Sequence, residues 1–132
     1  MTQPAGALTG ERGSGGGVDS EGGPFAFQAR GTGSGDEATG IFRYTIPSIG
    51  VQLVGDITCM IVSTSGSTRL ALMSGVFTQA TDPVYVGHEF ILQAQDGTTD
   101  GFSVDALSGG GACFPPFGAA AVASGAVTLV DA

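Results

Sequence analysis

The sequence is short of charge, and above all of positive charge. It has 132 residues, with no lysine, no asparagine, no tryptophan and a single histidine. Four arginines stand against twelve acidic residues, which gives a formal net charge of −8. Without lysine there is no Schiff-base nucleophile and no P-loop lysine, and one histidine cannot form a histidine-rich metal site. Nucleic-acid binding through phosphate neutralisation is not expected, and no cofactor is predicted.

Long apolar runs are also missing. No stretch approaches the roughly 18 apolar residues of a membrane-spanning helix, so no membrane insertion is expected. Residues 1–23 have no apolar leader region, which predicts either delivery without a leader or a leader removed beforehand. We expect an extracellular location or one on a cell or particle surface, and a cytoplasmic location stays open.

Glycine is abundant, with 24 residues, and it divides the chain by composition. Residues 1–23 combine glycine, serine and scattered charge, a composition that predicts a flexible arm. Such an arm becomes ordered only by lying on a protein partner or on another copy of the chain. Residues 24–132 have a regular apolar pattern and are predicted to form the folded domain.

The pattern from residue 24 onward has a period of two, which is typical of half-buried strands. Phe25, Phe27 and Ala29 share one face of the first predicted strand. A longer strand over residues 51–62 is expected to place on one face Val51, Leu53, Gly55, Ile57, Cys59 and Ile61. A later strand over residues 84–95 is expected to align Val84, Val86 and His88 with Phe90 on its inward face. The last strand is expected over residues 119–130.

Seven or eight such segments are joined by short turns, which predicts an all-β antiparallel domain. Several segments are long, and this favours a small closed or partly open β-barrel, with a two-layer β-sandwich as the alternative.

Two cysteines, Cys59 and Cys113, lie 54 residues apart and lack the CxxC spacing of zinc ribbons and thioredoxin-type sites. In an oxidising compartment they are expected to form a disulfide, whose loop closure would stabilise the fold by about 4 kcal/mol in the chain-entropy model. The alternative is two buried free thiols, since reduced cysteine is a common core residue.

His88 is the first candidate for chemistry. A histidine on the inward face of a barrel can act as a general base or a ligand contact, with Glu89 or Tyr85 beside it near the mouth. The competing interpretation is a core or rim histidine satisfied by a hydrogen bond. No G-x-S-x-G motif and no Ser-His-Asp relation is visible, so a catalytic triad is not predicted.

Asp96, Asp100 and Asp105 cluster in the segment DGTTDGFSVD. Calcium sites draw several oxygen ligands from a compact loop, but this spacing is not that of an EF-hand. The competing interpretation is that these carboxylates accept hydrogen bonds from backbone N–H groups in turns.

Five short segments carry a family resemblance. They are FAFQA (25–29), GSGDEATG (33–40), GDITCMIV (55–62), ACFPP (112–116) and SGAVTLVDA (124–132). With them the chain resembles small secreted β-modules of actinobacterial extracellular proteins, often of uncharacterised function. The resemblance implies an all-β extracellular module with one cysteine in the long third strand and one before the last strand. It implies no catalytic residues.

The function predicted from the sequence is a non-catalytic structural or binding module, displayed outside the cell or on a particle or filament surface. The alternative is a small-ligand-binding barrel, or a cyclase- or isomerase-like enzyme, with a cavity lined by His88.

Overall fold

The computed structural model describes residues 11–19, 21–31, 37–97, 100–107, 120–121 and 124–130. These residues form nine antiparallel strands and one short 3-10 helix, η1. The strands are β1 (Arg12–Val18), β2 (Pro24–Gly31), β3 (Glu37–Ile46), β4 (Val51–Ser65), β5 (Thr68–Ala80), β6 (Glu89–Asp96), β7 (Gly101–Leu107), β8 (Ala120–Ala121) and β9 (Ser124–Val130), with η1 at Pro83–Tyr85. Almost all of the described structure is strand, as the sequence predicted.

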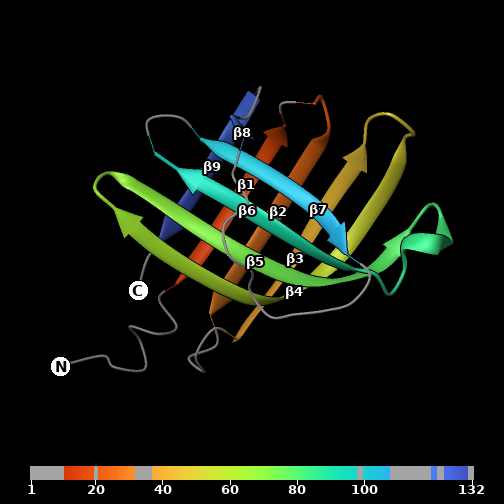
Figure 1. Cartoon of the computed structure of the whole chain (residues 1–132), viewed down its shortest axis with the longest axis horizontal. Coiled ribbons are helices and arrows are strands. Elements are labelled where there is room, and N and C mark those ends of the chain that lie inside the picture. The colour runs from red at the N-terminus through yellow and green to blue at the C-terminus, as the bar shows by residue number, and fades with distance from the viewer. Residues whose placement is uncertain are drawn as a thin grey trace.

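The strands belong to one sheet in the order β8-β7-β6-β5-β4-β3-β2-β1-β9. The sheet curls so that β5, β6 and β7 pass in front of β9, β1, β2 and β3 (Figure 1). The result is a nearly closed barrel with one unsealed seam, at which β9 lies against β6 rather than pairing with it by backbone hydrogen bonds. The predicted all-β fold with a partly open barrel is confirmed.

Phenylalanine fills the interior. Six rings are at most 4% exposed, and they come from five strands: Phe25, Phe27, Phe42, Phe77, Phe90 and Phe102. Phe25 of β2 and Phe102 of β7 stack with their ring centroids 4.1 Å apart, although four strands separate β2 from β7 in the sheet. This contact joins the two walls of the barrel through its centre, and stacked rings at such distances add to the stability that burial provides.

Two carboxylates bridge the seam. The backbone N–H of Leu129 donates to Asp96 Oδ2 at 2.9 Å, and the N–H of Val127 donates to Asp100 Oδ2 at 2.9 Å. Asp100 also accepts the N–H of Gly97 through its other oxygen, at 3.3 Å. Side-chain oxygens of the β6–β7 connection therefore take the place of carbonyl groups from a neighbouring strand.

β1 differs from the expected flexible arm. Residues 12–18 pair along their whole length with β2 on one side and β9 on the other. The positions of β1 that face the interior are Gly13, Gly15 and Gly17, which lie opposite Ala29, Phe27 and Phe25. A Cβ atom built on Gly15 would lie 2.7 Å from Cε1 of Phe27, and one on Gly13 would lie 2.7 Å from Cδ2 of Leu129. Neighbouring side chains occupy the space above β1, so the folded domain includes this strand.

Strand β4 contains a correction to its predicted inward face. The expected alternation holds for Leu53 and Ile57, but the register shifts between Ile57 and Cys59. Beyond this irregularity Met60 is buried, whereas Ile61, expected to face inward, is 40% exposed. A β-bulge has this effect because one extra residue reverses the faces of the residues that follow.

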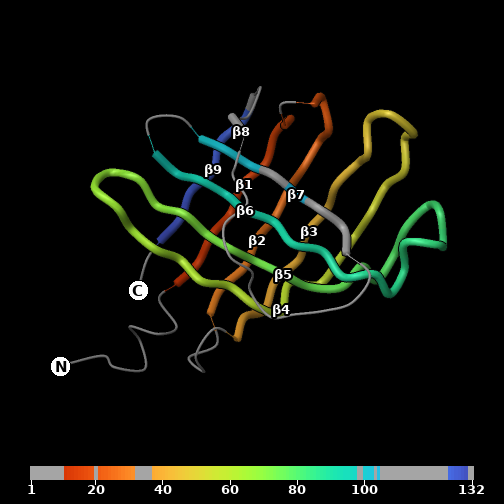
Figure 2. The backbone as a smooth tube through the Cα atoms, viewed as in Figure 1, coloured from red at the N-terminus to blue at the C-terminus, as the bar shows by residue number. Residues whose placement is uncertain are grey.

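The predicted strand over residues 84–95 is wrong in its first part. Val84 and Val86 are 62% and 46% exposed, and the strand begins only at Glu89. Asp82 caps η1 by accepting the N–H of Val84, and Gly87 has a φ of 88°, a conformation that favours glycine. This turn makes the β5–β6 connection project from the side of the barrel (Figure 2).

Candidate functional site

An open groove of about 680 Å³ crosses the outer face of four adjacent strands, β9, β1, β2 and β3. Strand register arranges its outward side chains in two parallel rows. One row is Val130, Arg12, Arg30 and Thr39, and the next is Thr128, Ser14, Gln28 and Ile41. Gly13, Ala29 and Gly40 complete the lining. The four strands span roughly 15 Å, since neighbouring strands lie about 4.8 Å apart.

Two arginines stand side by side in this groove. Arg12 of β1 and Arg30 of β2 are direct register partners, so their Cα atoms are about 4.5–5.5 Å apart. Both side chains are exposed, and neither has an ion pair with a carboxylate of the described residues. Glu11, the acidic residue nearest to Arg12 in the described chain, directs its carboxylate to the N–H of Val62 instead, at 3.4 Å.

This pairing is unfavourable without a ligand, because like charges placed directly opposite each other destabilise a sheet. The chain has only four positively charged side chains against twelve acidic ones, yet two of the four are adjacent here. Among the described lining residues of the groove, the charge is therefore opposite in sign to the net charge of the whole chain.

The side chains around the arginines are hydrogen-bonding groups rather than reactive ones. Ser14, Thr39 and Thr128 offer hydroxyl groups, and Gln28 offers an amide. Among the described residues, no histidine, cysteine, aspartate or glutamate lines the groove. With two guanidinium groups, three hydroxyls and an amide it can bind an anion, and none of its described lining residues is a general base or an activated nucleophile.

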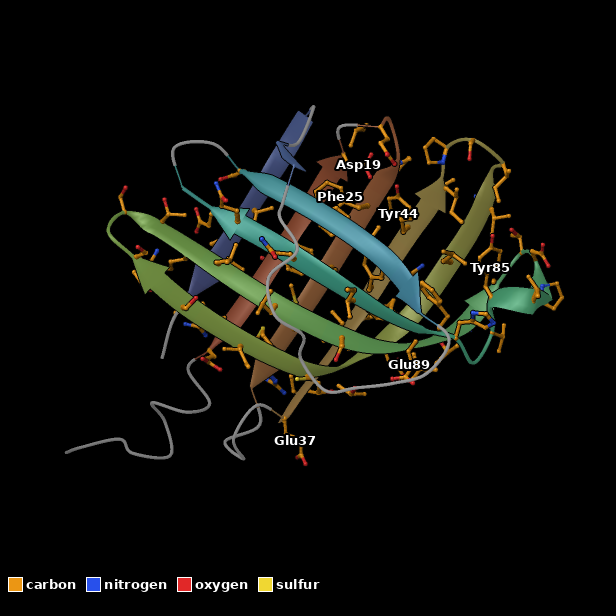
Figure 3. All side chains as sticks on the ribbon, in the orientation of Figure 1. Asp19, Phe25, Glu37, Tyr44, Tyr85 and Glu89 are labelled. Atoms are coloured by element: carbon orange, nitrogen blue, oxygen red, sulfur yellow. The ribbon has the colours of Figure 1, made fainter. Side chains whose placement is uncertain are left out.

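A second groove, of about 690 Å³, lies at one end of the barrel and includes Tyr44, Glu21 and Tyr85 in its lining. At the same end, Asp19 accepts the Tyr44 hydroxyl at 2.7 Å and the N–H groups of Gly23 and Glu21 at 2.8 and 3.0 Å. Figure 3 shows Asp19 and Tyr44 close together there. Asp19 is only 5% exposed, and these contacts fasten the β1–β2 turn to β3.

The environment of Tyr44 stabilises its neutral form. Burial first, and then the hydrogen bond and negative charge of Asp19, raise the pKa of Tyr44 above its usual value of 10.0. Asp19 and Tyr44 did not stand out in the sequence, because their separation of 25 residues becomes a contact only when β1 and β3 flank β2.

Two of the three candidates for general acid–base chemistry, Tyr85 and His88, lie on the projecting connection between β5 and β6. The rings of Tyr85 and His88 are 6.4 Å apart between centroids, and both side chains are half-buried. Glu89 begins β6 and is also half-buried. Figure 3 shows Tyr85 on the η1 segment, and its half-buried ring packs against the edge of the core cluster. His88 lines neither groove.

Two of the three clustered aspartates, Asp96 and Asp100, bond to backbone groups. Asp100 accepts the N–H of Gly97 within a turn, as the turn-capping interpretation describes, whereas the bonds of Asp96 and Asp100 to Leu129 and Val127 cross the seam to β9. Asp105 lies in β7, and its side chain is outside the described part of the structure. Within the described residues, no group of three or more His, Cys, Asp or Glu side chains is placed to hold a metal ion.

Cys59 is 5% exposed and faces the interior from β4. Cys113 lies outside the described residues, so its pairing with Cys59 stays a prediction.

Arg12 and Arg30 were not among the predicted site residues, because Arg12 lies within residues 1–23, the expected flexible arm. The outward alternation of Arg12 with Ser14, and of Gln28 with Arg30, was a signal in the sequence, but only the register shows that the two arginines are neighbours.

Comparisons with known proteins add no family. No family model, no curated protein and no solved structure matches this chain. Among the described residues, no helix is both long enough and apolar enough to cross a membrane.

Proposed function

We propose that this chain is a non-catalytic binding module, displayed outside the cell or on a particle surface, that holds an acidic partner in the groove over β9, β1, β2 and β3. The observation that carries the proposal is the pair Arg12 and Arg30, two exposed like charges placed opposite each other without a counter-charge from the described residues. An acidic partner removes this repulsion and supplies acceptors for the surrounding hydroxyl groups.

The packing of the interior favours this proposal over a ligand enclosed by the barrel. Six phenylalanine rings occupy the centre, and both grooves are open to the surface. His88, the residue on which the alternative depended, lies on the projecting β5–β6 connection. A partner is therefore expected on the outer face of the sheet.

The proposed location outside the cell is supported by the resemblance to secreted β-modules. An oxidising compartment would join Cys59 to Cys113, which intact-mass measurement with and without reductant detects as a gain of two hydrogens on reduction. Two free thiols in protein recovered from such a compartment would count against this location.

The binding proposal is tested with two immobilised polyanions, poly-glutamate and polyphosphate, at low and physiological ionic strength. A protein with a net charge of −8 is expected to be repelled by both unless a local site attracts it. We expect salt-sensitive retention on at least one polymer, and its loss in the double variant Arg12→Gln/Arg30→Gln.

Arg43→Gln is the matched control, because Arg43 is exposed on β3 but does not line the groove. It removes one positive charge and should retain binding. Retention that is equal in the wild-type protein and the double variant, or absent from both on both polymers, contradicts the proposal.

A further inference from the structure

We propose that the groove recognises a phosphomonoester group, with Arg12 and Arg30 sharing one doubly charged phosphate. This inference rests on the proposed function, because it specifies the chemistry of the ligand that the groove holds. It starts from charge. Two guanidinium groups on directly opposed residues place two positive charges on one patch of the outer face, and a dianion matches them whereas a monoanion leaves one unmatched.

The number and direction of the donors agree with a tetrahedral anion. Each guanidinium carries five N–H groups in a planar fork and can bond two oxygens at once. A phosphate ester presents three terminal oxygens, one to each arginine and one to share. Thr39 lies next to Arg30 in the same row, where its hydroxyl group adds a donor for an oxygen on that side.

The second row receives the remainder of the ligand. Ser14 and Gln28 are direct partners in this row, two residues along from the arginines on their strands, and Thr128 continues the row on β9. The diagonal separation of about 7–8 Å between the rows exceeds the size of one phosphate, so these groups face the alcohol portion of the ester. Their hydroxyl and amide groups suit a polar alcohol portion.

The number of negative charges on the ligand also disfavours two other anions. A phosphodiester carries a single negative charge, in agreement with the expectation that nucleic acid does not bind. One carboxylate also carries a single charge, and two carboxylates on one molecule need a spacing that matches the guanidinium pair, whereas a phosphate requires no such match.

The test measures dissociation constants by NMR titration of the ¹⁵N-labelled full chain with methyl phosphate, dimethyl phosphate and succinate at pH 7.5. Methyl phosphate is expected to bind up to about fivefold more tightly than dimethyl phosphate, since one further surface ion pair contributes up to about 1 kcal/mol. The perturbed amides should include those of Ser14, Gln28 and Thr39.

Arg12→Gln and Arg30→Gln are each expected to weaken methyl phosphate binding by about fivefold, and Arg43→Gln to leave it unchanged. Amide spectra of each variant show whether it is folded, so a loss of binding is separated from a loss of structure. Equal binding of methyl phosphate to the wild-type protein and both groove variants overturns the inference.

Two outcomes separate this inference from the binding proposal. If succinate or dimethyl phosphate binds as tightly as methyl phosphate and depends on the arginines, the phosphomonoester is wrong and the groove remains a binding site. If no anion, including the two polymers, binds in a manner that depends on the arginines, both proposals fail. Glucose 6-phosphate and a phosphoserine peptide then distinguish a sugar from a protein as the source of the ester, and weaker binding of both than of methyl phosphate overturns the role assigned to the second row.

Discussion

Two parts of the barrel wall line the core in opposite ways. In the wall formed by β3, β4 and β5, the strands contribute their own side chains, such as Ile57 and Met73, which are 1% exposed. In the wall formed by β2, β1 and β9, the central strand turns only glycine toward the interior, and its neighbours fill the space with Phe27 and Leu129. A strand can therefore be central to a sheet while its own sequence carries no apolar pattern.

The largest expected effect comes from opening a cavity in the wall that uses its own side chains. Ile57→Ala should lower the free energy of unfolding by about 3 kcal/mol, because it removes buried methyl groups from a close-packed site. Chemical denaturation monitored by circular dichroism measures the change. Thr58→Ala, on the exposed side of the same strand, is the control and should change stability by less than about 0.5 kcal/mol. Equal losses in the two variants would contradict the assignment of the inward face.

The opposite kind of substitution, which adds a side chain, should destabilise the wall formed by β2, β1 and β9. Gly15→Ala adds a Cβ that would lie 2.7 Å from Cε1 of Phe27, so the ring or the strand must move, and we expect a loss of about 2 kcal/mol. Gly16→Ala is the matched control, because the nearest atom to its Cβ, the carbonyl oxygen of Phe25, is 3.6 Å away. Its stability should be unchanged or slightly higher.

A second variant tests the cause of that loss. Phe27→Leu replaces the obstructing ring with a smaller side chain. It should destabilise the wild-type protein more than it destabilises the Gly15→Ala variant, so the two losses of stability should be less than additive. Additive losses in the double-mutant cycle would show that the contact between Gly15 and Phe27 is not what excludes a side chain from β1.

The two walls also show what sequence patterns can and cannot predict. The period of two that revealed β2 and β4 is carried by side chains, so it predicted the all-β fold and the buried Phe25, Phe27, Leu53 and Ile57. The inward face of β1 has no side chains, and its glycine-rich composition predicted flexibility instead. The reason for the glycines is the ring of Phe27, which becomes their neighbour only through strand pairing.

The candidate site was beyond prediction for a related reason. Arg12 and Arg30 are separated in the sequence and become adjacent through the register of β1 with β2.

The prediction for His88 depended on continuing the alternation of Val84 and Val86 into β6. The turn capped by Asp82 breaks that alternation, and Pro83 at its start is a residue that interrupts strands.

The walls differ also at their margins. β4 is paired on both sides, whereas the seam side of β9 is held by Asp96 and Asp100. Asp96→Asn replaces a charged acceptor with a neutral one and should lower stability by about 1.5 kcal/mol. Amide hydrogen exchange should accelerate at Leu129 and not at Met60 in β4. Unchanged exchange at Leu129 would mean that the carboxylate does not hold β9.

The smallest effect at neutral pH concerns the link between the two walls. Tyr44→Phe removes the hydrogen bond to Asp19 and should lower stability by about 1 kcal/mol. The pKa of Tyr44 is raised in the folded state, so the folded chain retains a proton that the unfolded chain loses above pH 10. Stability should therefore be complete below pH 10 and fall as the pH rises beyond it.

Denaturant unfolding between pH 8 and pH 11 measures this slope. It should be shallower in Tyr44→Phe than in Tyr85→Phe, which removes the chain's other tyrosine hydroxyl. Identical slopes in the two variants would exclude Tyr44 as the group responsible.

The carboxylates at the seam have a consequence for solubility. The outermost strand of an open sheet ordinarily invites a foreign strand to dock on its free amides and so begin a polymer. At Val127 and Leu129 those amides already have acceptors, and an approaching backbone would have to displace two negatively charged groups to reach them. The barrel can therefore remain partly open without offering β9 as a template for aggregation.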